Sequence, residues 1–251
     1  MYFWRYWRDT RRAVCVYLAA LLLVVLTWAI RIVHSGPLEH LAKLRGDGGA
    51  MTYTVTLLCA VVMGFVLGNN NVGSEIQKGT GDFLLTRPRT RRYFVWAGWT
   101  AGMTETVALM AISALIAAGA VTLAAGPVLW RRLPWTRPLL LNGAVTSVPL
   151  AAASLVLTGA TIFGLTYLLT VVFENGGRGL AASLGIFFGY SFLSEMLRRG
   201  AALPLPRVGI VQSAGVFSAW YLAPRVEIPL WIVLALAFPF ATQLVLERAE
   251  P

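Results

Sequence analysis

Residues 69–93 read NNNVGSEIQKGTGDFLLTRPRTRRY and lie between two long apolar segments of the chain. The stretch is too polar to cross a bilayer, yet it carries more apolar residues than a simple spacer needs. Its Lys and Arg residues outnumber its two acidic residues, which predicts a position on the cytoplasmic face of a membrane. Gly79, Gly81 and Pro88 permit a short helix followed by a bend. We therefore expect a membrane-surface element that docks a cytoplasmic partner.

The composition of the whole chain is that of a polytopic membrane protein. Of its 251 residues, 57% are hydrophobic and only 13% are charged, so one soluble core cannot hold the apolar side chains. The net charge of +10 raises the alternative of a nucleic-acid partner. The basic residues gather at the ends of apolar segments, however, and form no stripe on one helical face. We expect anchoring at the edges of a lipid membrane and no nucleic acid.

Six apolar segments are long enough to be membrane helices, which predicts an all-α fold in a single transmembrane domain covering residues 1–251. The third and fourth segments are longer than one crossing needs, and the fourth contains Asn142, Gly143, Gly159 and Gly164 as break points. Residues 126–138 and 174–178 are predicted turns. The predicted membrane segments are residues 13–33, 50–68, 93–125, 139–173, 179–197 and 227–246.

Two further segments are predicted to lie in the membrane interface. Residues 1–12 read MYFWRYWRDTRR, and at helical spacing the aromatic residues group opposite the arginines. This pattern predicts an interfacial amphipathic helix, with an unstructured basic tail as the alternative. Residues 198–226 are interrupted by Pro and Arg and are predicted to form an external re-entrant or interfacial segment. Six crossings place both termini on one side, and the two early basic clusters predict that this side is cytoplasmic.

Glu105 is an ionisable residue deep inside a predicted span. A carboxyl group at that depth is costly and must face protein or water. Two interpretations are equally open. Glu105 is a polar or proton-linked point on a translocation path, or it is bonded to a neighbouring helix.

Three pairs of glycines have the GxxxG spacing within or at the edge of apolar helices. Such pairs allow two helix backbones to approach closely, although the spacing also arises by chance in a chain with 24 Gly residues. The candidate helix-packing residues are Gly64, Gly68, Gly98, Gly102, Gly185 and Gly189.

No enzymatic motif is present in the sequence. The chain has no phosphate-binding loop, no HExxH zinc motif and no GxSxG nucleophile elbow. His34 and His40 lie in one loop without the partners that a metal site needs. Cys15 and Cys59 lie in apolar segments and form no disulfide framework. We expect no enzyme activity, no metal and no cofactor in this chain.

The sequence from Glu75 to Arg91 resembles the cytoplasmic segment between the second and third membrane helices of ATP-binding-cassette (ABC) type-2 permeases. In that family the segment is a coupling helix that rests on an ATPase subunit, and the chain often begins with an elbow helix. The resemblance covers residues 69–92 as the coupling segment. The residues that it implies for ATPase coupling are Glu75, Ile76, Gly79, Thr80, Phe83, Leu84, Leu85, Pro88 and Arg91.

The resemblance implies a permease subunit of an ATP-driven exporter in the cell (inner) membrane. Its partners would be ABC ATPase subunits, which hold ATP and Mg, and a second copy or relative of the permease. Two other classes stay open. A secondary transporter would have no ATPase partner, but it usually carries several buried ionisable groups and matched repeats. A membrane scaffold or assembly protein would leave the pattern from Glu75 to Arg91 without a purpose. The sequence leaves the substrate open.

Overall fold

The computed structural model describes the chain as an array of helices with one short β-hairpin. The helices are α1 (Tyr2–Val33), helical residues 61–69, α6 (Arg91–Trp130), α7 (Val148–Val172), α8 (Gly176–Ala201) and α10 (Pro224–Arg248). The prediction of a helical fold is confirmed, and the hairpin of β1 (Leu139–Leu141) and β2 (Ala144–Thr146) is the exception. The described residues are 2–33, 61–70, 91–130, 139–141, 144–146, 148–201 and 224–248.

Three of these helices are long and apolar enough to cross a membrane. The qualifying stretches are Tyr6–Thr27 in α1, Arg92–Ile116 in α6 and Leu155–Val172 in α7. Each has at least 18 residues, which at 1.5 Å per residue approaches the thickness of the hydrocarbon layer. The chain is therefore a membrane protein by length and composition of its helices.

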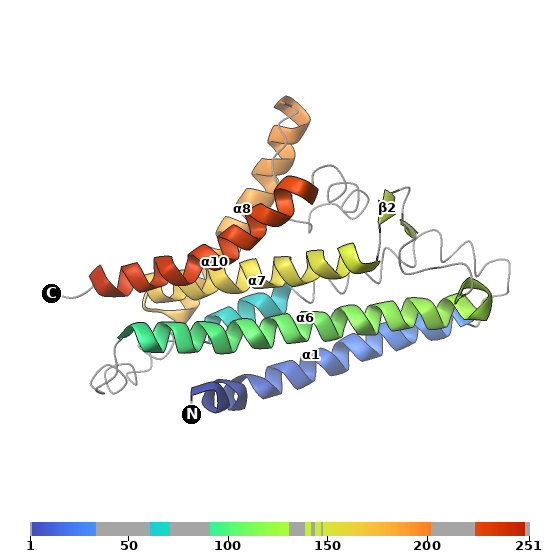
Figure 1. Ribbon diagram of the computed structural model, residues 1–251, viewed down its shortest axis with the longest axis horizontal. Coiled ribbons are helices and arrows are strands. Elements are labelled where there is room, and N and C mark those ends of the chain that lie inside the picture. The colour runs from blue at the N-terminus through green and yellow to red at the C-terminus, as the bar shows by residue number, and fades with distance from the viewer. Residues whose placement is uncertain are drawn as a thin grey trace.

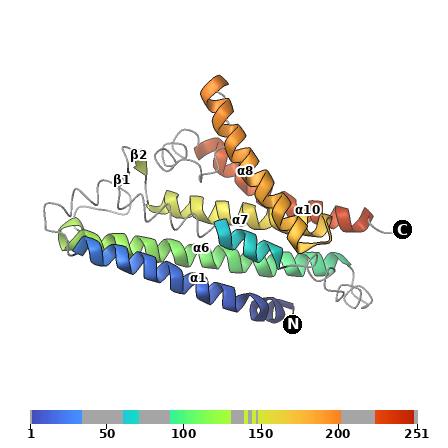
Figure 2. The same cartoon turned by 180° about the vertical axis from the view of Figure 1, so that it is seen from behind.

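The helices lie side by side around α6 and α7 (Figures 1 and 2). α1 packs along α6, α6 packs along α7, and α7 also contacts α8 and α10. Both chain termini lie at one end of the array, which we call the termini end (Figure 1). α8 leaves α7 at this end and then diverges from the other helices (Figure 2).

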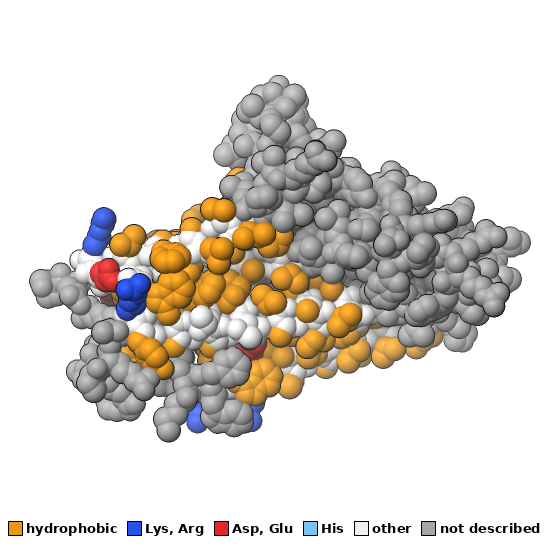
Figure 3. Space-filling model, in the orientation of Figure 1, with side chains coloured by type: hydrophobic (Ala, Val, Ile, Leu, Met, Phe, Trp, Pro, Cys, Tyr) orange, Lys and Arg blue, Asp and Glu red, His pale blue; other side chains and the backbone are white. Residues whose placement is uncertain are grey.

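Large apolar side chains fill the space between α1, helix 61–69, α6 and α7. Leu21, Leu67, Phe163 and Tyr167 are fully buried in one cluster that joins all these helices. Many large apolar side chains of several helices are exposed instead, and Figure 3 shows such residues over much of the described part of one face. In lipid these outward residues need no protein cover. They include Val16, Leu23, Leu26, Leu115, Phe192, Val233 and Phe240.

The first helix differs from the prediction, which placed a separate interfacial helix over residues 1–12. α1 runs from Tyr2 to Val33 without a break in its assignment, although its first turns change direction near the N-terminus (Figure 1). Tyr6 and Thr10 are buried against other helices, at 7% and 1% exposure. The first turns pack against protein because their polar groups have partners there, which the amphipathic pattern alone did not reveal.

The prediction also places the start of the turn after α6 too early, at residue 126. α6 is 40 residues long and continues to Trp130, so Gly126 and Pro127 belong to the helix. A proline near a helix end removes only one intrahelical hydrogen bond, and the Ala-rich run before it favours the helix.

The long apolar run over residues 139–173 is interrupted near the predicted break points Asn142 and Gly143, and a single long helix, α7, follows. The hairpin pairs Leu141 with Ala144, and α7 begins only at Val148. The intervening sequence is Asn142-Gly143, a pair that two-residue hairpin connections favour, although both residues lie outside the described part. Gly159 and Gly164, predicted as break points, instead lie within the continuous helix α7.

A three-residue turn joins α7 to α8, close to the predicted position. Glu174 has a φ of 49°, the left-handed conformation that ends many helices. The side-chain oxygen of Asn175 accepts a hydrogen bond of 3.0 Å from the backbone N–H of Arg178, which caps the start of α8. These two residues reverse the chain at the termini end.

Candidate functional site

The helices on either side of the predicted docking segment end and begin at the termini end. Helical residues 61–69 finish there, and α6 begins there with Arg91, the last of the predicted coupling residues (Figure 1). Arg91 is thus the first residue of a 40-residue helix. The other predicted coupling residues lie outside the described residues: Glu75, Ile76, Gly79, Thr80, Phe83, Leu84, Leu85 and Pro88.

Six basic side chains are described at the termini end. Every Lys or Arg whose side chain is described belongs to the first turns of α1, the start of α6, the start of α8 or the end of α10. Figure 3 shows the blue side chains at the edges of the orange apolar surface near this end. These residues are Arg8, Arg11, Arg12, Arg92, Arg178 and Arg248, and all are exposed. Basic residues also occur near the opposite ends of α1, α8 and α10, at Arg31, Arg198, Arg199 and Arg225. Positive residues thus flank both ends of these helices, as expected for anchoring at the two edges of a membrane.

The first turns of α1 hold the end of helix 61–69. The hydroxyl group of Tyr6 donates a hydrogen bond of 2.7 Å to the backbone carbonyl of Leu67, and the N–H of Asn70 approaches the same oxygen at 3.2 Å. The last carbonyls of a helix have no partner within the helix, so Tyr6 caps this end. Asn70 is the second residue of the predicted docking segment. The hydrogen bond from Tyr6 therefore holds the start of that segment, which we call its base, against α1.

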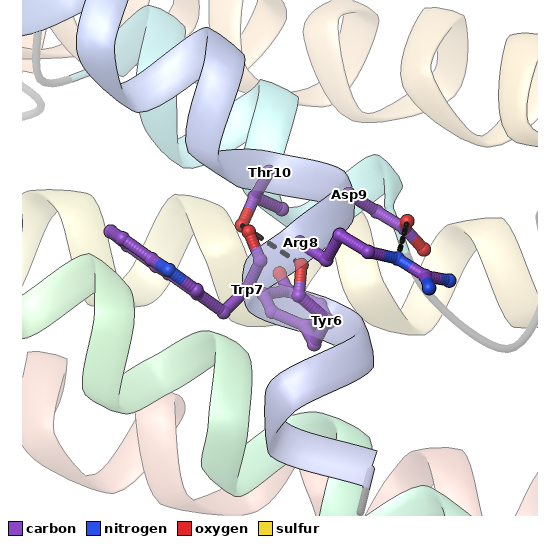
Figure 4. A network of polar contacts seen from close by, with 5 residues as sticks. All are labelled: Tyr6, Trp7, Arg8, Asp9 and Thr10. Carbon is purple, nitrogen blue, oxygen red and sulfur yellow. Dashed lines mark hydrogen bonds and ion pairs between the residues drawn. The ribbon is translucent and has the colours of Figure 1, made fainter.

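One turn further along α1, Thr10 meets Glu105 of α6. The Thr10 hydroxyl oxygen lies 2.7 Å from one carboxyl oxygen of Glu105 and 2.9 Å from the other. It also lies 3.0 Å from the carbonyl oxygen of Tyr6, and Figure 4 shows it directed back along the helix. Arg8 and Asp9 form an exposed ion pair of 3.7 Å that points away from Thr10 (Figure 4).

Glu105 is thus bonded to a neighbouring helix, which is the second of the two interpretations drawn from the sequence. Its exposure is 8%, and no ion pair to it is found among the described residues. A place for Glu105 on a translocation path stays a prediction. Among the described side chains, no group of three His, Cys, Asp or Glu residues could hold a metal ion.

A second polar contact joins the same two helices deeper in the array. The hydroxyl oxygens of Tyr17 and Ser113 are 2.7 Å apart, and Ser113 donates its own hydrogen bond to the carbonyl of Leu109. Tyr17 is therefore the donor between the two side chains. Because Tyr17 follows Thr10 by two turns and Ser113 follows Glu105 by two turns, α1 and α6 run parallel.

α6 is also joined to α7 and α10 near its start. The Tyr167 hydroxyl donates to the carbonyl of Val95 at 3.1 Å, and the Trp96 indole N–H donates to the side-chain oxygen of Gln243 at 2.9 Å. The Trp96 ring also packs edge to face against Phe240, with centroids 5.0 Å apart. The first turns of α6, directly after the docking segment, thus have contacts to two other helices, α7 and α10.

The predicted glycine pairs fall into two groups. An added Cβ on Gly64 would lie 3.1 Å from the Gly159 carbonyl, on Gly68 2.7 Å from Thr166, and on Gly102 2.5 Å from Phe163. Glycine is needed there because the backbones and side chains approach so closely. Gly98 is buried in the same helix as Gly102. Gly185 and Gly189 of α8 instead face open space in the described structure, so their role in packing stays a prediction.

Sequence reasoning missed four residues that bind α1 to the array and one that binds α10 to α6. The first four are Tyr6, Thr10, Tyr17 and Ser113, and the fifth is Gln243. The sequence contains a pattern that could have identified the residues of α1, but none for their partners. Tyr6, Thr10 and Tyr17 recur at intervals of four and seven residues, and so share one face of the helix. The partner on each neighbouring helix depends on the relative position of the helices, which one sequence does not give.

No protein-family model matches the chain, and no significant match to a curated protein or to a solved structure was found.

Proposed function

We propose that this chain is the membrane-spanning subunit of an ATP-driven exporter of the ABC type-2 kind. The observation that carries the proposal is the pattern from Glu75 to Arg91, inserted between two apolar helices at the termini end of the array. A partner that hydrolyses ATP would rest on this segment. The chain itself would carry no ATP, Mg or other cofactor.

The proposed topology has six spans with both termini in the cytoplasm. α1, α6 and α7 are three of them, and we assign the others to residues 50–68, α8 and α10. α8 and α10 have 26 and 25 residues, which is sufficient for one crossing each. The alternating directions of these helices put the docking segment, the α7–α8 turn and both termini on the same side.

The contacts at the termini end support a mechanical route from the docking segment into the membrane. α6 follows the segment directly, and its first turns contact α7 and α10 through Tyr167 and Gln243. α1 is attached to the other end of the segment through Tyr6. Movement of the segment by the ATPase would therefore tilt α1, α6 and α7 together. The path for substrate would open between this chain and a second permease copy or relative.

Co-purification tests the proposal with least effort. The full chain, expressed in its own host with an affinity tag, should bring down an ATPase subunit in stoichiometric amount from mild detergent. A secondary transporter would instead move substrate without such a partner, and a scaffold protein would do neither. Purification of a chain that transports its substrate with no ATPase present would overturn the proposal.

Substitutions in the docking segment then test its role. Glu75→Lys and Leu84→Asp should reduce ATP-dependent transport at least about tenfold while the chain still inserts into the membrane, because a 1.4 kcal/mol loss of docking energy corresponds to a factor of ten. Glu174→Lys is a matched control, since Glu174 is exposed at the same end but outside the segment. Normal coupled transport in both segment variants would contradict the assignment.

A further inference from the structure

The contact between Thr10 and Glu105 contains fewer hydrogen-bond donors than an ionised carboxylate needs. A carboxylate has two acceptor oxygens, and Thr10 has a single hydroxyl proton to give. The neighbouring hydroxyls of Thr104 and Thr106 donate to carbonyl oxygens of their own helix, at 2.7 Å and 2.8 Å, so their protons are already used. Within the described residues, an ionised Glu105 would have one donor for its two oxygens.

Among the described side chains, no cation forms an ion pair with Glu105. The described charged groups on α1 within two residues of Thr10 are Arg8, Asp9, Arg11 and Arg12, and all four are exposed. Arg8 and Asp9 pair with each other. α7 packs against α6 with Phe163, whose ring lies beside Gly102, and with Tyr167, whose hydroxyl donates to the carbonyl of Val95. The Tyr6 hydroxyl donates to the carbonyl of Leu67. A buried charge without an ion partner is strongly disfavoured, most of all in a membrane helix.

A neutral carboxylic acid removes the buried charge from this contact and supplies a second donor. The protonated oxygen of Glu105 can donate to the Thr10 hydroxyl oxygen at 2.7 Å or 2.9 Å, whichever oxygen carries the proton. Thr10 is then free to donate its own proton to the carbonyl of Tyr6 at 3.0 Å. The result is a continuous chain of donors from α6 into the first turns of α1.

We propose that Glu105 is a proton-binding site, at which a neutral carboxylic acid donates a hydrogen bond to Thr10 and latches α1 to α6. The latch lies about 21 Å along α6 from Arg91, at 1.5 Å per residue. Loss of the proton would leave a buried carboxylate with one donor and would weaken the α1–α6 contact. The proposal rests on the described geometry alone and holds whether or not an ATPase partner exists.

Infrared spectroscopy of the full chain in lipid nanodiscs tests this assignment. Exposed glutamates ionise near pH 4.3, so at neutral pH the carbonyl stretching band of a protonated carboxyl group should report the buried one. Labelling of glutamate with ¹³C at the side-chain carboxyl should shift this band. Glu105→Gln should abolish it, and Thr10→Val should raise its frequency because the donor loses its acceptor. Thr10→Ser keeps the hydroxyl and should leave the band nearly unchanged.

The result that would overturn the proposal is the absence of a protonated glutamate band in the wild-type chain at neutral pH. A band that persists in Glu105→Gln would also overturn it, because another glutamate would then carry the proton. If Glu105→Gln does not fold, the frequency shift between the wild-type chain and Thr10→Val decides: an unshifted band contradicts the latch.

Discussion

The hydroxyl group of Tyr6 lies 2.7 Å from the backbone carbonyl of Leu67 and caps the helix from which the docking segment departs. The two residues are 61 positions apart in the chain, so the contact ties the N-terminus to the second predicted span. Gly102 makes room for it, because an added Cβ there would lie 2.6 Å from the Tyr6 hydroxyl. The first helix is therefore a structural support for the base of the segment as well as a membrane anchor.

Removal of this hydroxyl should weaken the support without disturbing the aromatic packing. Tyr6→Phe keeps the ring and removes the donor, so that among the described residues the Leu67 carbonyl keeps the N–H of Asn70 at 3.2 Å. We expect a loss of about 0.5–1.5 kcal/mol in the free energy of unfolding. Hydrogen exchange of the backbone should also become faster at residues 67–70. Exchange that stays at the wild-type rate would show that Tyr6 does not cap this helix.

The contact between Tyr17 and Ser113 should contribute a measurable coupling between α1 and α6. Tyr17→Phe, Ser113→Ala and the double variant form a thermodynamic cycle in which each single change removes the same hydrogen bond. Hydrogen bonds between membrane helices contribute about 0.6 kcal/mol on average, so we expect a coupling energy of that order in reversible unfolding from detergent. Additive effects of the two single variants would show that the side chains do not interact.

The two classes of glycine should respond in opposite ways to alanine. Gly102→Ala would place a Cβ 2.5 Å from the ring of Phe163, which is fully buried and cannot move aside. We expect a loss of about 1–3 kcal/mol from overpacking, measured as a lower unfolding temperature in detergent. Gly185→Ala is the matched control, because a Cβ there meets nothing within 4 Å. It should be neutral or slightly stabilising, since alanine favours the helix. Equal losses in both variants would contradict the packing described for α6.

Much of the helical arrangement follows from the sequence, because apolar length and turn residues are local signals. The turn at Glu174 and the interruption before α7 carry Asn and Gly, and both could be placed from those residues. The continuation of α1 through Thr10 could not, because the polar face of residues 1–12 fits an interfacial helix as well as a buried one. The partners of Glu105 and Tyr6 depend on how helices dock. Docking is decided by contacts between residues some 60 to 95 positions apart, which a periodic pattern does not encode.

Among the described glycines, Gly179 is the one whose added Cβ would meet the closest neighbour, where α7 turns into α8, and this gives a sharp test of the fold. A Cβ on Gly179 would lie 2.4 Å from the Cα of Thr170 and 2.7 Å from its backbone nitrogen. Backbone atoms within a helix cannot yield as a flexible side chain can, so Gly179→Ala must separate the start of α8 from α7. We expect a loss of at least about 3 kcal/mol, at the upper end of overpacking costs.

Gly177→Ala is the control for this variant, because it lies two residues away on the same helix. Its Cβ would meet only the Asn175 side-chain oxygen, at an ordinary contact distance of 3.4 Å. Removal of a glycine from the first turn of a helix should be neutral or stabilise the chain by up to about 1 kcal/mol. Unfolding of the two variants in the same detergent gives the comparison. If Gly179→Ala proves as stable as Gly177→Ala, α7 and α8 do not form the close hairpin described here, and α8 must leave the array at another position.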